Sequence, residues 1–130
     1  MLSTFDELQI LISGIICGLI LFQSIFVAPT VFKELAEEHR PVILRSLFPK
    51  LFKSIATLGL VFLLLAIESM SGFIVGLITT ISGIVCLSLI GATNKAKDEG
   101  NNKKFALLHR ISVLLTMTVL VFNTFWIFLN

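Results

Sequence analysis

The sequence predicts an all-α integral membrane protein, a four-helix bundle with an interfacial amphipathic helix between the first two spans. Hydrophobic residues make up 56% of the 130 residues and charged residues 14%, whereas soluble domains carry about 25% charged residues. Four segments are apolar over the roughly 20 residues that a helix needs to cross a bilayer, and the mean hydropathy is +1.01. The composition excludes a soluble enzyme. The net charge of +2 lacks the basic excess of a nucleic-acid-binding protein.

The first span is expected over residues 8–28, which carry no charge. Thr4 and Glu7 fit a capping box, with Thr4 as the N-cap. Asp6 and Glu7 also lie at the positive end of the helix dipole, where carboxylates are favourable. The apolar run is too long for a signal-peptide core and no basic region precedes it, so we expect no cleavage.

Residues 29–49 are too long and too patterned for a simple connection. Apolar side chains recur there at helical spacing, at Val31, Phe32, Leu35 and Ala36. The pattern predicts an amphipathic helix lying at the membrane interface, or a kinked extension of the first span beyond Pro29. Pro41 is expected to end this helix, because a proline disfavours helical backbone at the residue before it.

The other three spans are expected over residues 51–67, 72–93 and 105–129. The second span is charged only at Lys53, near its start, and we expect Lys50 and Lys53 to extend their ammonium groups to the surface. Residues 94–104 have the polarity and the glycine of a solvated turn.

The charges predict the orientation of the bundle. All ten Lys and Arg residues belong to the side with the loops at residues 29–50 and 94–104: Lys33, Arg40, Arg45, Lys50, Lys53, Lys95, Lys97, Lys103, Lys104 and Arg110. The positive-inside rule therefore predicts both loops in the cytoplasm and both termini outside. The short chain suits a bacterial inner membrane. Trp126, near the outer end of the last span, is expected at the membrane interface.

Glycines at one-turn spacing indicate close helix packing in the first and third spans. Gly14 and Gly18 form one GxxxG pair, Gly72 and Gly76 form another, and Gly83 extends the second stripe. Small residues one turn apart let helix backbones approach closely in lipid. These glycines are expected to pack against neighbours within one chain or across a homo-oligomer.

Polar residues that cluster at the cytoplasmic mouth form the candidate ligand-binding site: Gln23, Asn94, Asp98, His109 and Arg110. His109 and Arg110 lie at the edge of an apolar helix, where polar groups are costly and tend to face a partner or a cavity. For Gln23, and for Asn123 near the outer end of the last span, interhelical hydrogen bonding is the alternative.

His39 and His109 are two weak candidates for a haem or metal ligand. Both can also be polar surface groups. Cys17 and Cys86 are expected at unlike depths, which makes a poor disulfide. No triad of serine, histidine and aspartate and no phosphate loop is evident. The leading hypothesis is a non-enzymatic protein that binds or moves a small ligand or serves as a partner subunit. A haem- or porphyrin-linked redox protein and a structural oligomer are the alternatives.

Two stretches also carry a resemblance to a known family. They are Val-Ala-Pro-Thr-Val-Phe at residues 27–32 and Leu-His-Arg-Ile-Ser at residues 108–112. With the spacing of the four spans, they resemble the small four-helix membrane proteins of the uncharacterised, transmembrane protein 205-like family. The resemblance implies a multi-pass membrane protein without an established reaction.

Overall fold

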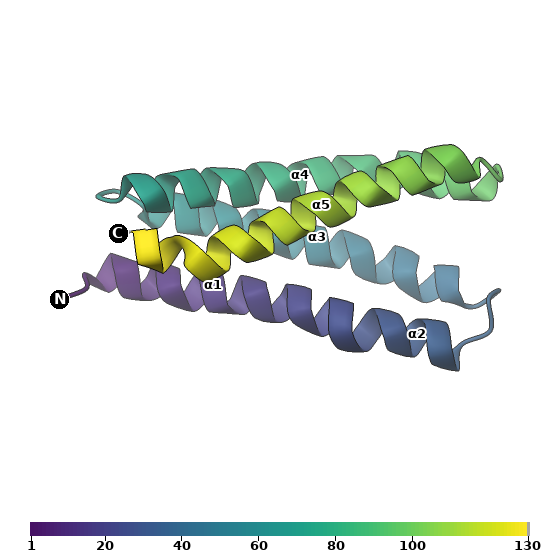
Figure 1. Cartoon of the computed structure of the whole chain (residues 1–130), viewed down its shortest axis with the longest axis horizontal. Helices are drawn as coiled ribbons and strands as arrows, with labels where there is room; N and C mark the ends of the chain where they lie inside the picture. The colour runs from purple at the N-terminus through teal and green to yellow at the C-terminus, as the bar shows by residue number, and fades with distance from the viewer. Residues whose placement is uncertain (130) are drawn as a thin grey trace.

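The computed structural model describes residues 1–129, and these residues form helices without a strand. Four helical units are long and apolar enough to cross a membrane: Thr4–Glu34, Arg40–Leu65, Met70–Asp98 and Asn102–Phe128. They lie side by side as an up-and-down bundle, with both chain ends at the same end of the molecule (Figure 1). The predicted four-helix membrane bundle is confirmed, and the chain is an integral, multi-pass membrane protein.

The first span is one continuous helix made of three parts. These are α1 (Thr4–Phe22), the π-helix η1 (Gln23–Val27) and α2 (Ala28–Glu34). Of the two arrangements open for residues 29–49, the structure therefore has the extension beyond Pro29. No separate interfacial helix lies between the first two spans in residues 1–129. Pro29 lacks an N–H and would break a regular helix, and a π turn is a common way to absorb such a break.

The N-terminal cap of α1 lies one residue earlier than predicted. Ser3, not Thr4, is the N-cap residue, and its Oγ accepts a hydrogen bond from the Asp6 backbone N–H at 3.2 Å. Asp6 returns the interaction by accepting from the Ser3 N–H at 3.0 Å. The reciprocal pair is the same device that we expected for Thr4 and Glu7, with an aspartate in place of the glutamate.

The second span, α3 (Arg40–Leu65), begins well before the predicted residue 51. Pro41 lies in its first turn and so starts this helix instead of ending the preceding one. A proline is favourable there because first-turn N–H groups have no intrahelical acceptor. Pro49 lies inside α3, so a proline near the expected boundary does not stop the helix.

The last two spans are α4 (Met70–Asp98) and α5 (Asn102–Phe125), and a short 3-10 helix, η2 (Trp126–Leu129), follows α5. The turn between α4 and α5 is shorter than the predicted loop at residues 94–104. Gly100 has a φ of +70° in this turn, a left-handed conformation that glycine adopts without steric cost. Asn101 caps α5 by accepting from the Lys104 N–H at 3.2 Å.

Helices α3 and α4 pack with almost no space between their backbones. A Cβ added to Gly83 would lie 2.7 Å from the backbone nitrogen of Ala56, and one added to Gly76 would lie 2.8 Å from Cα of Leu63. Gly59 makes the same approach from the α3 side. Glycine at these positions lets two spanning helices gain dispersion contacts along their length, which drives helix association in lipid.

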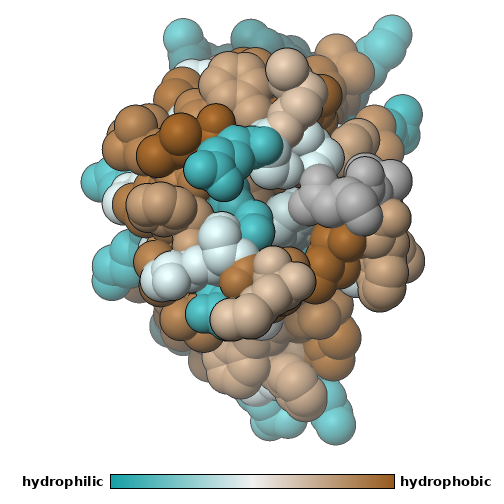
Figure 2. All heavy atoms as spheres, turned by 90° about the vertical axis from the view of Figure 1, so that its left-hand side faces the viewer, coloured by the Kyte–Doolittle hydropathy of each residue, from teal (hydrophilic) through white to brown (hydrophobic). Residues whose placement is uncertain are grey.

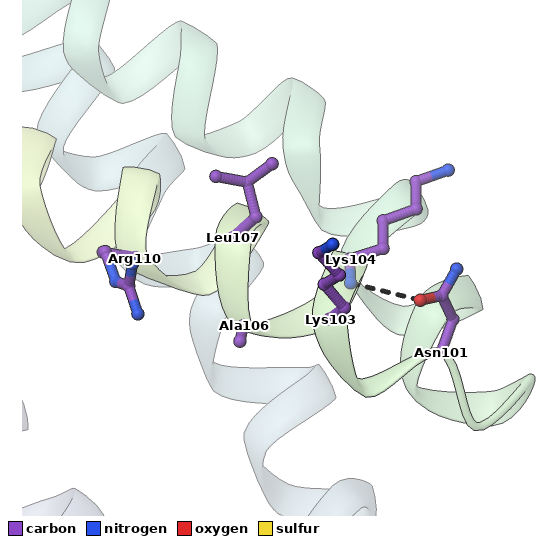
Figure 3. Close-up of a pocket in the computed structure, with 6 residues that line it drawn as sticks. All are labelled: Asn101, Lys103, Lys104, Ala106, Leu107 and Arg110. Atoms are coloured by element: carbon purple, nitrogen blue, oxygen red, sulfur yellow. Dashed lines mark hydrogen bonds between the residues drawn. The ribbon is translucent and has the colours of Figure 1, made fainter.

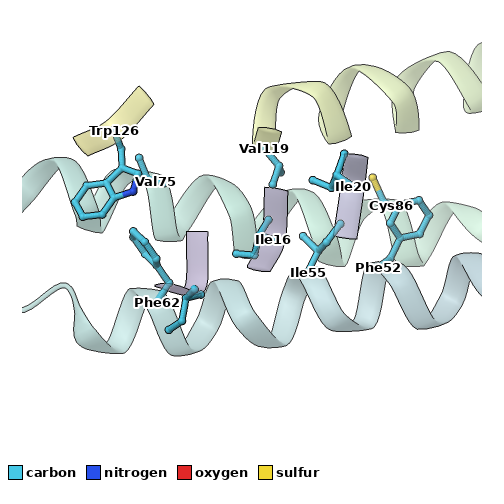
Figure 4. Packing of buried hydrophobic residues seen from close by; sticks show 10 residues of the cluster. Ile16, Ile20, Phe52, Ile55, Phe62, Val75, Cys86, Val119 and Trp126 are labelled. Carbon is cyan, nitrogen blue, oxygen red and sulfur yellow. The ribbon is translucent and has the colours of Figure 1, made fainter. Parts of the chain in front are cut away.

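A column of buried apolar side chains runs along the middle of the bundle (Figure 4). Ile16, Ile20, Ile55, Phe62 and Val75 are almost inaccessible to solvent. Large apolar side chains also cover the outside of the helices, from Leu11 in α1 to Val121 in α5, as a surface in contact with lipid requires.

We name the two ends of the bundle by their residues. The terminal end contains residues 1–3, 66–69 and 126–129, and the basic end contains the connections at residues 35–39 and 99–101. Viewed onto the terminal end, hydrophilic residues gather in the middle and hydrophobic residues surround them (Figure 2). Nine of the ten Lys and Arg residues lie on α2 or on the halves of α3, α4 and α5 that are nearer the basic end, and Lys53 lies at the middle of α3.

Candidate functional site

The sequence-predicted site residues all lie towards the basic end, but the structure does not gather them into one cavity. His109 and Arg110 are exposed on α5, and the His109 ring stacks on Phe105 with centroids 5.8 Å apart. Asn94 is half-buried on α4, and Asp98 is exposed at the end of that helix. Gln23 starts the π-helix η1, and its Nε2 atom is buried with no hydrogen-bond partner among the described residues.

Arg110 is the one of these residues that borders a hollow at the start of α5. The hollow measures about 530 Å³ and its lining consists of Asn101, Lys103, Lys104, Ala106, Leu107 and Arg110. Ala106 and Leu107, the apolar part of its lining, leave α5 on different sides, between Lys103 and Arg110 along the helix (Figure 3). Cationic groups beside apolar ones match a ligand that has an anionic and an apolar part.

Three other cations at the basic end already have partners. Arg45 on α3 donates from both terminal nitrogens to the two carboxylate oxygens of Asp98, with Nη1 3.1 Å from Oδ2. Lys95 Nζ lies 3.9 Å from a Glu99 carboxylate oxygen. Arg40 donates to two backbone carbonyls near the end of α2, those of Phe32 and Leu35. The Arg45–Asp98 pair connects α3 to α4 in a bidentate geometry.

The side chains of Lys103, Lys104 and Arg110 form no ion pair and no hydrogen bond within residues 1–129, and the same is true of Lys33 and Lys50. What sets the α5 cations apart is that they border one hollow. Lys103 and Lys104 also lie in the first turn of α5, where the helix dipole is positive and no residue is acidic. Positively charged side chains are unfavourable at the positive end of a helix dipole. An anion bound there would relieve the repulsion between these side chains and the dipole.

The two histidines lie on different elements. His39 is exposed in the connection before α3, with Nε2 3.4 Å from a carboxylate oxygen of Glu38. His109 belongs to α5. No group of three or more His, Cys, Asp or Glu side chains that could hold a metal ion occurs in the described part of the chain.

The two cysteines are both free thiols; they lie on different helices, α1 and α4, and both contact α5. Cys17 Sγ lies 3.6 Å from the Thr124 hydroxyl, and Cys86 Sγ lies 3.8 Å from the Ser112 carbonyl oxygen.

A buried polar network at the terminal end was not predicted. Ser13 Oγ on α1 accepts from the Trp126 indole N–H at 2.9 Å and donates to Asn123 Oδ1 at 3.0 Å. The Asn123 amide nitrogen then donates to Thr79 Oγ1 on α4 at 2.9 Å and to the Val119 carbonyl at 2.9 Å. These side chains are all at least 95% buried. The network joins the first, third and fourth spans.

The network bears on two sequence-based expectations. Asn123 makes the interhelical hydrogen bonds expected of it. Trp126 is buried inside the bundle instead of exposed to the membrane interface: its exposed fraction is 2%, and its ring packs edge-on against Phe62 with centroids 5.3 Å apart. Its indole N–H needs an acceptor, and inside the bundle Ser13 supplies one.

One signal in the sequence could have indicated the network. Gln9, Ser13, Ile16 and Ile20 are spaced as one face of a helix, so the polar pair at its start is buried with the isoleucines. Gln9 Nε2 donates to the Phe62 carbonyl of α3 at 3.2 Å, which adds the second span to the buried polar contacts at this end.

The predicted packing glycines fall into two groups. Gly72, Gly76 and Gly83 are buried, and an added Cβ at each would contact a neighbouring side chain or backbone. Gly14 and Gly18 are exposed on α1, and a Cβ added to either would have no such neighbour within 4 Å. The α1 glycines therefore face away from the other helices of the chain.

Comparison with known proteins gives a family but no characterised relative. No curated protein and no solved structure matches the chain. The domain of unknown function DUF4149 matches residues 11–128. That stretch contains the buried core, the polar network and the basic hollow described above. Because the match covers nearly the whole chain, this membrane protein belongs to the DUF4149 family.

Proposed function

We propose that this protein is a non-enzymatic membrane protein that binds a small amphiphilic anion at its basic end, which faces the cytoplasm in this proposal. The observation that carries the proposal is the set of unpartnered cations, Lys103, Lys104 and Arg110, beside the apolar residues of the α5 hollow. A ligand with a phosphate or carboxylate group and a short apolar part would satisfy both features.

The remaining predicted site residues have secondary parts in this proposal. Arg110 and His109 anchor the ligand. Asn94 and Asp98 complete the rim from the neighbouring helix α4, and Gln23 supplies an amide on η1. The engagement of Asp98 with Arg45 supports a rim role for it, because its charge is already compensated. Whether the bound anion is then moved across the membrane is a separate step, and binding is the claim tested first.

Hexyl phosphate is a suitable probe, because it combines the two features in a small, water-soluble molecule. Its binding can be measured by isothermal titration calorimetry on protein in nanodiscs of phosphatidylcholine, which has no net charge. A charge-assisted hydrogen bond contributes about 1.5 kcal/mol or more, so Arg110→Gln should weaken binding about tenfold. The double variant Lys103→Gln/Lys104→Gln should weaken it at least as much, and His109→Ala should weaken it less.

The matched control is Lys95→Gln, which removes a cation at the same end that already has an acidic neighbour. Binding should then stay close to that of the unchanged protein. Equal affinity in Arg110→Gln and in Lys95→Gln would remove the α5 hollow from the proposal.

A second role, as a homo-oligomer or the subunit of a larger complex, is supported by the exposed pair Gly14 and Gly18 on α1. Small residues on an open helix face permit close approach of another helix in lipid. Gly14→Leu/Gly18→Leu should lower the mass of the detergent-solubilised particle if this face is a seam. An unchanged mass would assign these glycines to lipid contact.

A haem- or porphyrin-linked redox role remains the third proposal, with His109 as ligand and His39 as a weaker one. It is supported by the exposure of His109 on an apolar helix. Protein purified gently from its native membrane should then show a porphyrin absorbance band that His109→Ala abolishes. A colourless, well-folded protein would oppose it.

The finer placement of the protein is also part of the proposal. We propose kinship with the transmembrane protein 205-like proteins, on the two stretches quoted for that resemblance, and a place in the bacterial inner membrane. The cytoplasmic orientation of the basic end is supported by the concentration of nine of the ten Lys and Arg residues towards it, as the positive-inside rule requires. A reporter enzyme that works only outside the cytoplasm should therefore be active when it is fused at the C-terminus.

A further inference from the structure

A second hollow lies between the first and second spans, away from α5. It measures about 370 Å³, and its lining comprises Leu19 of α1 with Lys53, Ser54, Thr57 and Leu58 of α3. None of these residues takes part in the α5 hollow, so an occupant of this second hollow does not depend on the proposed function. The hollow combines a cation and two hydroxyl groups with two leucines. It lies on the side of two spanning helices, where apolar side chains are expected.

Lys53 is the first of these polar residues. It stands at the middle of α3 (Arg40–Leu65), about 20 Å from either end of the helix by its rise per residue. Its ammonium group has no ion-pair partner in residues 1–129. A cation in a membrane span is costly unless it pairs with an anion or reaches water. An anionic partner beside Lys53 would remove that cost.

Thr57, one turn further along α3, has a hydroxyl without a partner. Five threonine hydroxyls on α4 and α5 donate to the backbone carbonyl four residues earlier, at Thr80, Thr93, Thr116, Thr118 and Thr124. The hydroxyl of Thr57 forms no hydrogen bond with any described residue, although the residue is exposed to the hollow. A free hydroxyl donor in an apolar surrounding favours a ligand that offers an acceptor oxygen.

The order of these groups along α3 follows the order of chemical groups in a phospholipid. Because α3 runs from the basic end to the terminal end, Lys53 lies nearest the basic end, Thr57 comes next and Leu58 lies deepest. A lipid whose headgroup is at the basic end presents its phosphate, then its ester carbonyls, then its acyl chains. Cation, hydroxyl donor and leucine match these three levels in turn.

We propose that this hollow binds one anionic phospholipid from the leaflet at the basic end. The Lys53 side chain extends towards the basic end, where its ammonium group pairs with the lipid phosphate. An ester carbonyl accepts from Thr57, and an acyl chain lies along Leu19 and Leu58. The lipid is anionic and not zwitterionic because Lys53 has no other counter-charge.

The test counts lipids that stay bound to the protein. Protein in nanodiscs with equal parts of phosphatidylglycerol and phosphatidylcholine is released and analysed by native mass spectrometry. The unchanged protein should retain one phosphatidylglycerol in preference to phosphatidylcholine. Lys53→Gln should reduce the retained phosphatidylglycerol about tenfold and Thr57→Val about threefold, as expected for a charged and a neutral hydrogen bond.

Matched controls separate a built site from general attraction. Lys50→Gln removes a lysine one turn away that does not line the hollow, and Thr118→Val removes a hydroxyl that already donates to the Leu114 carbonyl. Both should retain the lipid. The thermal unfolding midpoint should rise with added phosphatidylglycerol in the controls but not in Lys53→Gln, because a ligand of the folded state stabilises it.

Three results would overturn the proposal. Equal retention of the two lipids would show that the headgroup's net charge does not matter. An equal loss in Lys50→Gln and Lys53→Gln would mean diffuse attraction to a basic surface. Binding of inorganic phosphate to protein in phosphatidylcholine nanodiscs, lost in Lys53→Gln, would identify a soluble anion as the occupant. The α5 variants tested with hexyl phosphate bear on none of these results, so the two proposals fail independently.

Discussion

Replacing Asn123 by leucine should weaken the terminal end of the bundle measurably. Leucine has a similar volume but no hydrogen-bonding group, so Asn123→Leu removes the contacts with Ser13 and Thr79 while keeping the space filled. Interhelical hydrogen bonds in membrane proteins average about 0.6 kcal/mol and reach about 1.7 kcal/mol. Two such bonds give an expected loss of about 1–3 kcal/mol in the free energy of unfolding.

The structure provides an internal reporter for this experiment. Trp126 is the one tryptophan of the sequence, it is 2% exposed, and it donates to the same Ser13 hydroxyl. Its fluorescence during titration with a denaturing detergent therefore follows the unfolding of the network itself. We expect Asn123→Leu to move the transition to a lower detergent fraction and to alter the emission of the folded state.

Thr118→Val is the control on the same helix, because the Thr118 hydroxyl is exposed and donates within α5. It should change the unfolding free energy by no more than about 0.5 kcal/mol. The double variant Ser13→Ala/Asn123→Leu should cost less than the two single changes added together, since both remove one shared bond. An Asn123→Leu protein as stable as the Thr118→Val control would refute the reasoning that the network stabilises the bundle.

Three further perturbations have expected signs that follow from the geometry. Gly83→Ala should destabilise the protein by about 1–3 kcal/mol in the same detergent titration, because its Cβ would meet the Ala56 backbone; unchanged stability would mean that α3 and α4 separate easily. Gly91→Ala should instead stabilise it, by up to about 1 kcal/mol, since nothing lies within 4 Å of a Cβ there; a loss would reveal a neighbour on that face. Asp98→Asn should lower the thermal unfolding midpoint only slightly, with an effect that shrinks as salt rises, because its ion pair with Arg45 is exposed and salt screens such pairs. A large, salt-independent loss would contradict the surface character of that pair.

The spans could be predicted because lipid imposes a simple requirement on sequence. Every backbone polar group must be satisfied within the helix, and about 20 apolar residues must be consecutive. Helix ends were less predictable, since this requirement stops at the membrane surface. Pro41 and Pro29 illustrate the limit: a proline both breaks a helix and suits its first turn, and the choice depends on packing that one sequence does not display.

The candidate site could likewise be predicted only in part. Arg110 could be selected from its charge at the edge of an apolar helix. The significance of Lys103 and Lys104 could not be seen, because it depends on which cations find acidic partners in three dimensions, as Arg45 does with Asp98. The Ser13–Asn123 contact joins residues 110 positions apart, and its existence depends on the rotation of two helices about their own axes. Hydropathy describes each span separately and carries no such information.

The glycine packing between α3 and α4 also bears on how the chain is assembled during synthesis. These two helices are consecutive and joined by a short connection, so their seam can close as a hairpin as soon as both are in the membrane. The polar network cannot form then, because Asn123 and Trp126 belong to the end of the fourth span, and Trp126 is 113 positions from Ser13. Until the fourth span enters the membrane, Ser13 and Thr79 have to find other partners there. The network therefore closes only when the fourth span packs against the first and the third, and a chain interrupted before Asn123 would leave buried hydroxyl groups of the earlier spans unmatched.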